Sequence, residues 1–575
     1  MCSYIQYTKR MQKSYRVRER LHDNLLEHLL LSRGIVPEEF AAFLAPDFVR
    51  DSHNPFLLPD MEKAVERILS AAKNNEQVGV WSDYDADGLP GGVMLAQFLR
   101  TLGLSVRHYV PHRHKEGYGL NTDGLAELAA QGITLLVTVD LGTTDVEQIS
   151  FAKGKGIDII VTDHHLEPPV LPEAFALINP KLKSSRYPFD GLCGAGVAWK
   201  LVQAVLSKHR PEGFAEGYEK WYLDLVGIGT LSDMVPLRGE NRMLAHFGLT
   251  VMRRARRPGL AALLNLLRIK PATLTEDDVG FMISPRINAA SRMDSPEAAA
   301  RLLATEDKVE AGELALALNK INDERKVLVA TTVKEVNKRL QLIGLESPVI
   351  VMGNPAWRPG ILGLVANSLA EAHGKPAFVW GRGGSTPTPH ESGLLRGSCR
   401  SDGATNVVDL MGAVPGVFED FGGHFASGGF SLPPERAHEL PARLAEAYEL
   451  LRAQRATPKE VVADRELELA EAPHALRDLD KLAPFGVGFE KPLFIFPGVS
   501  VAGARTFGKQ QNHLELSLTR PSTTLGASER IAGIAFFSTP ESFTKKPGLG
   551  DSVSVVGNVE RDWRGAPRLR VVDIV

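Results

Sequence analysis

Short apolar runs alternate with amphipathic stretches between residues 61 and 162, and this alternation predicts a parallel α/β sheet. Four short segments read as strands, the first of them as a buried apolar run. They are Gln77–Trp81, Ser105–Pro111, Thr134–Asp140 and Ile157–Thr162. The stretches with helical apolar spacing are Met61–Ala72, Gly91–Leu102, Asn121–Gln131 and Thr144–Lys153. Such an order is typical of a doubly wound, mostly parallel sheet with helices on both faces.

The rest of the chain predicts helices around this sheet and a β-rich C-terminal part. Further helices are expected at Arg18–Leu31, Leu192–Leu206, Lys220–Ser232 and Arg253–Leu267. Five candidate strands, typical of an OB-like barrel, are Leu493–Arg505, His513–Thr519, Arg530–Phe537, Ser552–Val559 and Arg568–Ile574. The predicted domains are a helical lead-in (1–60), an α/β domain (61–250), a connecting helix (251–270), a second α/β domain (271–452) and the barrel (464–575), with a polar linker at Arg452–Ala463.

Composition narrows the class of protein. A chain of 575 residues exceeds one hydrophobic core, and 44% apolar with 23% charged residues is typical of a globular protein. The formal net charge of −3 requires any nucleic-acid surface to be local. Three cysteines without CxxC spacing exclude a disulfide framework and a zinc knuckle, which fits a reducing, cytoplasmic setting. No apolar run approaches the ~20 residues of a membrane span.

Acidic residues follow several of the predicted strands. The loop Asp83-Tyr84-Asp85-Ala86-Asp87-Gly88 comes after the first strand, Asp140 ends the third, and Asp163-His164-His165 follow the fourth. Asp233 ends a later helical segment. A single acid at such a place is usually a helix cap, and an isolated DxDxDG is usually a turn. Because the carboxyl ends of parallel strands face one crevice, we expect these side chains to converge.

Convergence of these side chains would favour a metal site. Four carboxylates, those of Asp85, Asp87, Asp140 and Asp233, carry a charge that two divalent cations neutralise. Carboxylates with one imidazole suit Mg²⁺ or Mn²⁺, and the nitrogen favours Mn²⁺.

Eight motifs occur in a fixed order along the chain. They are DYDADG (83–88), VTVDLG (137–142), VTDHH (161–165), GIGTLSDMVPL (227–237), PRINAASRM (285–293), WRPGILGLVA (357–366), GSCRS (397–401) and GGHFASGG (422–429). In these motifs the chain resembles the DHH/DHHA1 phosphoesterases and, within them, the RecJ family of single-strand-specific 5′→3′ DNA exonucleases. The resemblance implies that 61–250 is a DHH catalytic domain and 271–452 a DHHA1 substrate-binding domain.

The resemblance also implies roles for individual residues. The implied ligands of two divalent ions, Mn²⁺ or Mg²⁺, are Asp85, Asp87, Asp140, His164 and Asp233. His165 would contact the scissile phosphate, and Asp163 would orient a histidine. Asp83 stays open between an outer role and an ordinary loop residue. The implied reaction is two-metal hydrolysis of single-stranded DNA to 5′-mononucleotides.

Several polar residues are candidates for DNA contact. Arg113 and Tyr118 lie in a basic stretch with interleaved aromatic residues, which could equally be a packed loop. The other candidates are Arg286, Asn288 and Arg292 in one loop, Ser398 and Arg400 in another, and Gly422, Gly423 and His424 in a glycine-rich turn. Barrel candidates are Phe485, Phe489, Phe507 and Lys509, although aromatic residues in a small barrel are more often core. The arginines of Met252–Pro258 are expected on a solvated helix face.

Two other functions stay open at this point. One is a different DHH enzyme, such as a nanoRNase, a cyclic-dinucleotide phosphodiesterase or a pyrophosphatase, but these are shorter and lack the barrel. The other is a non-catalytic DNA-binding scaffold, against which the intact ligand set argues. Departures from the family pattern are Pro90, Leu141, Ser291 and Arg358, none of which is an expected ligand.

The resemblance further implies partners and a setting. It implies work on single-stranded DNA in recombination, end resection and mismatch repair, beside a single-strand-binding protein and a RecQ-type helicase. A cytoplasmic monomer without membrane contact is expected. Because the chain ends on a predicted strand at Val575, a further C-terminal domain is conceivable.

Overall fold

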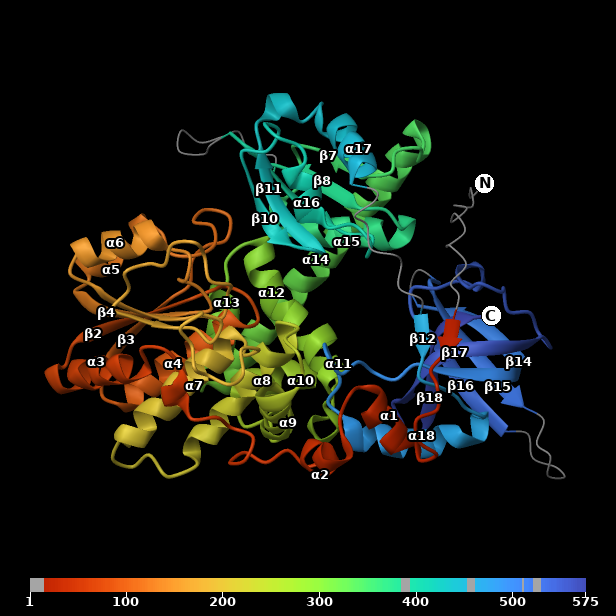
Figure 1. The fold of residues 1–575 in the computed structure, drawn as a ribbon, viewed down its shortest axis with the longest axis horizontal. Helices are drawn as coiled ribbons and strands as arrows, with labels where there is room; N and C mark the ends of the chain where they lie inside the picture. Colours follow the sequence, from red (N-terminus) through yellow and green to blue (C-terminus); the bar gives the residue numbers. More distant parts are fainter. Residues whose placement is uncertain (1–14, 384–392, 452–460, 509–510, 521–528) are drawn as a thin grey trace. The chain divides into compact units, whose positions relative to one another are not determined.

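The computed structural model describes residues 15–383, 393–451, 461–508, 511–520 and 529–575 (Figure 1). The chain forms two compact units. The first unit consists of Ala45–Leu328 with Pro484–Glu490, and the second of Met1–Leu44, Val329–Ala483 and Lys491–Val575. Within the described ranges, no helix is both long enough and apolar enough to cross a bilayer.

A five-stranded parallel sheet forms the centre of the first unit (Figure 1). Its strands are β2 (Gln77–Ser82), β3 (Ser105–Tyr109), β4 (Ile133–Val139), β5 (Asp158–Thr162) and β6 (Ala176–Ile178), in the order β3-β2-β4-β5-β6. Each neighbouring pair is parallel. The predicted doubly wound parallel sheet is therefore confirmed, with β6 as an additional edge strand.

Helices cover both faces of this sheet because its strands alternate their side chains between two cores. Val80 points into the larger core and Trp81 into the smaller one. Figure 1 shows α5 (Thr122–Ala130) and α6 (Val146–Gly154) on one face. The other face carries α3 (Met61–Asn74), α4 (Gly88–Thr101) and α7 (Gly194–Lys208), followed by α8 (Leu223–Ser232) and α9 (Gly239–Met252).

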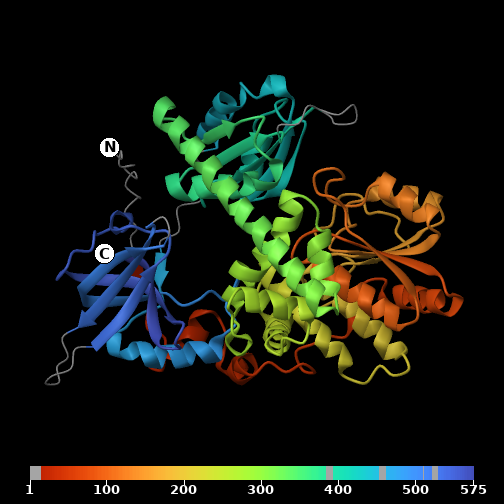
Figure 2. The same cartoon turned by 180° about the vertical axis from the view of Figure 1, so that it is seen from behind.

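The predicted connecting helix at 251–270 is misplaced. Residues 258–266 form α10 (Pro258–Leu266), whose Leu260, Leu263 and Leu264 are buried in the larger core of the first unit. The chain passes into the second unit along α14 (Lys308–Ile343), a helix of 36 residues seen in Figure 2. Apolar spacing shows that a segment is helical but not what it packs against. The spacing therefore does not distinguish a core helix such as α10 from a connecting helix such as α14.

The second unit contains a five-stranded sheet and a barrel. The sheet has the order β10-β11-β9-β8-β7 and includes β9 (Leu395–Arg400), β10 (Asp420–His424) and β11 (Ser427–Leu432). Its neighbouring strands are antiparallel, except for β7 and β8, which are parallel. Its other strands and helices are β7 (Ile350–Gly353), β8 (Ala377–Gly381), α15 (Pro359–His373), α16 (Val407–Gly412) and α17 (Leu440–Leu450). The barrel strands are β13 (Arg465–Glu466), β14 (Phe494–Phe507), β15 (His513–Arg520), β16 (Glu529–Ala535), β17 (Ser552–Arg561) and β18 (Pro567–Ile574). Pairing of β14 with both β15 and β17 closes the barrel.

The predicted lead-in at 1–60 is divided between the two units after Leu44, and its N-terminal part is attached to the barrel. Strand β1 (Tyr15–Val17) pairs in parallel with β12 (Val461–Ala463). Arg33 donates to both carboxylate oxygens of Asp464, at 3.1 and 3.2 Å. The predicted helix at 18–31 is shorter, because α1 (Leu25–Ser32) begins only after Asn24, whose side chain caps it. Of the predicted linker, 452–460 lies outside the described residues, as does Lys509.

Candidate metal centre

The acidic loop after β2 is folded by its own carboxylates. Asp85 Oδ1 accepts hydrogen bonds from the backbone N–H groups of Asp87 at 2.8 Å and Gly88 at 3.0 Å. This turn leads directly into α4, which begins at Gly88. A side chain at Gly88 would meet the backbone of Asp83 at 2.9 Å, so the tight turn requires glycine. The sequence DYDADG therefore places three carboxylates close together at the carboxyl end of the sheet.

Asp87 is held by the N-terminus of α7. Its two carboxylate oxygens accept from Gly194 N–H at 2.6 Å and Ala195 N–H at 2.9 Å. Unpaired backbone N–H groups and the helix dipole both favour an anion at this place. Burial and the charge of Asp85 nevertheless raise the pKa of Asp87 to about 6. The Asp87 carboxylate is thus held in a fixed orientation, but the negative charge of Asp85 beside it is not compensated.

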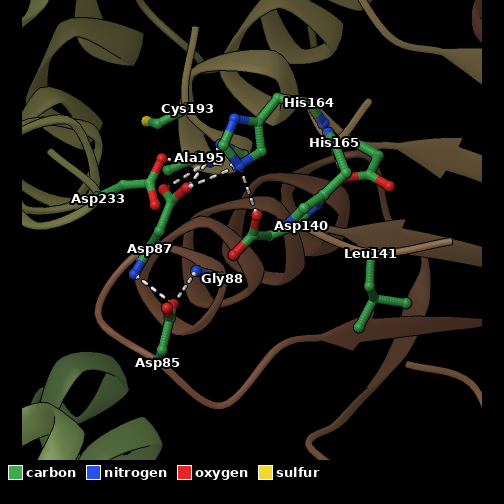
Figure 3. A network of polar contacts seen from close by, with 12 residues as sticks. Asp85, Asp87, Gly88, Asp140, Leu141, His164, His165, Cys193, Ala195 and Asp233 are labelled. Atoms are coloured by element: carbon green, nitrogen blue, oxygen red, sulfur yellow. Dashed lines mark hydrogen bonds and ion pairs between the residues drawn. The ribbon is translucent and has the colours of Figure 1, made fainter. Parts of the chain in front are cut away.

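Asp140 directly follows β4 and has a left-handed conformation, with φ of 66°. Its backbone N–H donates to Thr162 O at 2.9 Å, and the Tyr118 hydroxyl donates to its carbonyl at 3.0 Å. These two bonds hold a conformation that is uncommon for residues other than glycine, although aspartate and asparagine tolerate it best. Left-handed backbone at this strand end directs the carboxylate toward the other acids, as Figure 3 shows.

His164 lies among three of these carboxylates (Figure 3). Its Nε2 is 3.1 Å from Asp140 Oδ1, 3.6 Å from Asp233 Oδ2 and 4.0 Å from Asp87 Oδ2. Burial lowers the pKa of His164 to about 3, so the imidazole is neutral at physiological pH. A neutral imidazole beside carboxylates is suited to bind a metal ion.

The ligand atoms form overlapping groups that fit more than one cation. One group is Asp87, His164 and Asp233; a second is Asp83, Asp85 and Asp140; a third is Asp140, His164 and His165. Within each group the ligand atoms lie within 4.8 Å of one another. Asp140 belongs to two groups and would be shared. The five predicted ligands are thus brought together, and Asp83, whose role was left open, joins them.

The pKa shifts of these carboxylates indicate whether the site suits cations. Burial, followed by the like charges around them, raises the pKa of Asp83 and Asp140 well above the ordinary value and that of Asp233 to about 8. Asp83 Oδ1 is buried and makes no hydrogen bond within the described part of the chain. Buried acids that repel one another and lack donors are stabilised by cations, and oxygen-rich ligand sets suit Mg²⁺ and Mn²⁺.

His165 points its ring at the same centre and is oriented by Asp163. His165 Nδ1 lies 2.7 Å from Asp163 Oδ1, which also accepts from the backbone N–H of His164 at 2.7 Å. Burial lowers the pKa of His165, but the bond to Asp163 and its charge outweigh this and raise it overall. Asp163 has a lowered pKa because bonds from His165 and Thr143 outweigh its burial. A carboxylate on Nδ1 leaves Nε2 of His165 for other contacts.

Two of the predicted DNA-contacting residues lie beside this centre. The Arg113 guanidinium is 5.0 Å from the ring centroid of Tyr84, inside the acidic loop. Tyr118 is 49% exposed, and its hydroxyl is 3.4 Å from His165 Nδ1. Both residues therefore border the metal centre, and Tyr118 is half-exposed there.

The expected loop with Arg286, Asn288 and Arg292 is instead helix α12 (Ser284–Met293) of the first unit. Pro285 at the start of the segment and apolar residues at helical spacing explain why it is a helix. Its polar residues favoured the prediction of a loop. Arg286 is buried and donates to Asn319 Oδ1 at 2.8 and 3.0 Å, so it ties α12 to α14. Asn288 Oδ1 accepts from Ala86 N–H at 2.9 Å and braces the acidic loop.

The candidates in the second unit also lie on strands rather than in loops. Ser398 and Arg400 are on β9, and Gly422, Gly423 and His424 are on the exposed edge strand β10. The sequence reads there as turns because of its glycines, but β10 and β11 pair antiparallel through them. Their contact with DNA stays a prediction.

Phe485 and Phe489 do not belong to the barrel. Both are buried in the first unit, to which 484–490 belongs. Of the remaining barrel candidates, Phe507 ends β14, with its ring 5.1 Å from that of His513.

Residues that hold the ligands were missed by the sequence patterns. The N–H groups of Gly194 and Ala195 are backbone contacts, and Asn288 acts from about 200 residues away. The available signal was the pair Gly194 and Gly196 at the start of a predicted helix, because glycine permits close backbone approach to an anion.

Replacing Gly194 by alanine is expected to weaken Mn²⁺ binding. A methyl group there would lie 2.4 Å from Asp140 Cβ and would displace one ligand while moving the donors of another. Disturbing groups that orient metal ligands typically lowers affinity roughly 10–100-fold. Calorimetric titration with Mn²⁺ checks this, and Gly196→Ala is the matched control, since its methyl group would have 3.5 Å of clearance. Equal affinity of the two variants would contradict the expectation.

Comparison with known proteins identifies the family. Models of the DHH family N-terminal domain, the DHHA1 domain and the RecJ OB domain match residues 77–230, 346–450 and 463–572. The single-stranded-DNA-specific exonuclease RecJ of Bacillus subtilis is 31% identical over 564 residues, which cover 96% of this chain and 68% of that protein. The chain belongs to the RecJ family. RecJ of Haemophilus influenzae is 33% identical over 81% of this chain and 82% of its own length.

Solved RecJ structures share the fold. RecJ of Thermus thermophilus in complex with Mn²⁺ superposes with a TM-score of 0.76 at 26% identity, covering 98% of this chain and 80% of that chain. The same protein with Mg²⁺ gives a TM-score of 0.70 at 25% identity, covering 98% and 78%. The two ions found in these relatives are those favoured by the carboxylate-rich ligand groups described above.

Proposed function

We propose that this RecJ-family chain is a metal-dependent 5′→3′ exonuclease that degrades single-stranded DNA to 5′-mononucleotides. The observation that carries the proposal is the set of overlapping ligand groups around Asp140, with His164 within 4.0 Å of three carboxylates. Two divalent ions, Mn²⁺ or Mg²⁺, would be held by Asp83, Asp85, Asp87, Asp140, His164 and Asp233. When bound, such ions polarise the phosphodiester and lower the pKa of water.

The chain's own residues supply orientation and a proton donor. Asp163 fixes the His165 ring, whose raised pKa favours the protonated form. A protonated Nε2 can donate to a phosphate oxygen and stabilise the negative charge that develops there. Tyr118, bonded to the Asp140 carbonyl, keeps that residue in its left-handed conformation. Its half-exposed ring offers a surface on which a base can stack.

The polarity of digestion tests the function. Single strands labelled at either end are incubated with Mn²⁺, and label is expected to leave the 5′ end first, as mononucleotide. Blunt duplex of the same sequence should resist. Release chiefly from the 3′ end, or equal attack on duplex, would refute the proposal. A dinucleotide or cyclic dinucleotide as the better substrate would favour the other DHH phosphodiesterases.

Arg292→Ala is expected to weaken binding of a 5′-phosphorylated oligonucleotide about tenfold, since a charge-assisted bond contributes about 1.5 kcal/mol or more. Arg113 and Arg292 both act electrostatically on Tyr84 in the acidic loop, where burial raises the tyrosine pKa to about 12. Fluorescence anisotropy in an inactive background measures this. Arg107→Ala, whose guanidinium is exposed and paired with Glu127 at 3.2 Å, is the control. A loss that is equal for 5′-hydroxyl and 5′-phosphate ends would contradict phosphate recognition.

We further propose that the barrel binds single strands over one outer face. Strands β14, β15 and β16 form a groove of about 530 Å³, with small residues Gly503, Ser517 and Ala532 along it. Arg505 and Arg530 line the same groove. OB-type barrels commonly bind oligonucleotides on this face, where arginine meets phosphate and aromatic rings stack on bases.

Phe537→Ala is expected to weaken binding of a 20-nucleotide strand roughly five- to tenfold, because stacking contributes about 1 kcal/mol or more. Phe537 follows β16, is 80% exposed, and has φ of 53°. Its backbone N–H donates to His513 Nδ1 at 2.9 Å, and the two rings meet edge to face with their centroids 4.9 Å apart. Leu549→Ala, at 79% exposure in the same unit, is the control. Equal affinities in anisotropy titrations would refute the stacking role.

Family membership supports wider expectations. We infer that the chain works as a cytoplasmic monomer in recombination and mismatch repair, beside a single-strand-binding protein and a RecQ-type helicase. Stimulation of digestion by these proteins in a reconstituted assay tests the partners, and light scattering tests the monomer.

A further inference from the structure

A short segment far along the chain packs within the unit that holds the metal centre. Pro484–Glu490 belongs to the first unit, although the residues on both sides of it belong to the second. We call these seven residues, PFGVGFE, the aromatic segment. The rings of Phe485 and Phe489 lie parallel, with centroids 5.7 Å apart and an interplanar angle of 3°. Phe489 is fully buried, so the segment is a packed element of the first unit.

One backbone and one side-chain hydrogen bond join the aromatic segment to the chain just after Asp233. Leu237 N–H donates to Val487 O at 2.8 Å. Arg238 Nε donates to Gly488 O at 2.8 Å. Only three residues separate Asp233 from Leu237, so these bonds fix the path of the chain directly beyond a candidate ligand.

Side chains reinforce this attachment. The Arg242 guanidinium lies 5.1 Å from the ring centroid of Phe489 and donates to Pro484 O at 3.2 Å. Arg242 is 3% exposed, and a desolvated arginine over an aromatic ring contributes more than an exposed one. A side chain at Gly486 would lie 2.7 Å from Leu237 Cδ1, so the glycine allows the close approach.

The loop that the aromatic segment holds is strained. Met234 has φ of 58° and is 71% exposed, so neither backbone preference nor packing of its side chain explains its position. Backbone in this region persists for a bulky residue only when surrounding contacts determine it. The anchored residues on its C-terminal side, Pro236 and Leu237, supply such contacts, because Asn241 Nδ2 donates to Pro236 O at 3.1 Å.

The same loop also reaches a second candidate ligand. Val235 packs in one buried apolar cluster with Cys193 and Ala195. Ala195 N–H is one of the two donors that hold Asp87, at 2.9 Å. Movement of this loop would therefore disturb Asp233 directly and Asp87 through the start of α7.

We propose that the aromatic segment is a positioning element of the metal centre, which fixes Asp233 and Asp87 through the loop 234–238. The inference rests on the proposed metal-dependent function. Val487 and Gly488 act through Leu237 and Arg238, and Phe489 acts through the Arg242 guanidinium that lies over its ring. The segment lies about 250 residues beyond the ligand that it positions.

Titration of the metal-free, full-length chain with Mn²⁺ tests this proposal. Phe489→Leu is expected to weaken Mn²⁺ binding roughly tenfold, as loss of groups that orient ligands typically does. Phe496→Leu, which removes a ring that is equally buried in the barrel, should lower the melting temperature but leave Mn²⁺ affinity unchanged. In an Asp233→Asn background, Phe489→Leu should add no further loss of affinity, because coupled residues are not additive.

Unchanged Mn²⁺ affinity of Phe489→Leu, with a melting temperature as low as that of Phe496→Leu, would overturn the proposal. If Phe489→Leu does not fold, Arg238→Ala carries the same test, since it removes the side-chain bond from Arg238 Nε to Gly488 O of the segment. No DNA is present in the titration. Failure to degrade DNA despite tight, Phe489-dependent Mn²⁺ binding would refute the exonuclease and leave the positioning role standing.

Discussion

Asp140→Asn is expected to lower the rate of single-strand digestion at least roughly a thousandfold, which is about 4 kcal/mol of transition-state stabilisation. Asp140 belongs to two of the three ligand groups, so its carboxylate serves more than one cation position. Asparagine has nearly the same shape and tolerates the left-handed φ of 66°. The substitution therefore removes charge with little change in backbone conformation.

The same variant is expected to be more stable than the parent when metal is absent. Burial and the charges of Asp87 and Asp85 raise the pKa of Asp140 well above its ordinary value. The folded metal-free protein must therefore either keep an unfavourable charge or take up a proton, and asparagine does neither. A gain of about 1 kcal/mol would raise the melting temperature by about 2 °C or more. Mn²⁺ should stabilise the variant less than the parent.

Asp224→Asn is the control for this experiment. Asp224 is also buried, but it is paired with Arg257 at 2.8 Å. Removing one partner of a buried ion pair is destabilising, so this variant should melt earlier and keep its activity. If Asp140→Asn melts earlier as well and retains digestion, the carboxylates do not form a cation site.

The sheet and most of the ligands could be predicted because the information is local. Apolar runs of five to seven residues mark β2, β4 and β5, and Asp140 and Asp163 follow two of them directly in the sequence. Parallel strands bring such ends together by topology, so a linear pattern is enough. Asp233 lies at the end of a helix and has no strand to mark it, so the acidic pattern offered it only as a candidate, and the resemblance then implied its role as a ligand.

Partners that are distant in sequence could not be predicted in this way. Asn288 braces the acidic loop from α12, and Phe489 packs into the first unit from beyond α18 (Ala472–Leu482). Nothing in the periodicity of either segment tells what it packs against. α14 was missed for the same reason, since its amphipathic pattern resembles that of any buried helix. Asp83 stayed open because its role depends on burial and on a missing hydrogen-bond donor.

Lowering the pH from 8 to 5 is expected to stabilise the metal-free protein, in contrast to the usual effect of acid on paired carboxylates. The folded-state pKa is about 6 for Asp87 and about 8 for Asp233, because of burial followed by neighbouring negative charge. The same groups titrate near ~4 in the unfolded chain. Between these values the folded state binds more protons, so its stability falls as the pH rises from about 4 to about 8.

Mn²⁺ should reverse this dependence. Mn²⁺ binds deprotonated ligands, so it must displace the proton of each ligand that is protonated. At a pH below the folded-state pKa of such a ligand, the apparent affinity for Mn²⁺ should fall about tenfold per pH unit for each proton displaced. For Asp233, whose folded-state pKa is about 8, this amounts to roughly a hundredfold between pH 8 and pH 6. At 100 times the dissociation constant, binding at one site stabilises by about 2.7 kcal/mol, so saturation at pH 8 raises the melting temperature by several degrees. Asp233→Asn should make both pH profiles shallower, because one of the groups that exchange protons with the metal is gone. A Mn²⁺ shift that is the same at pH 6 and pH 8 in the parent would show that these acids are not the ligands.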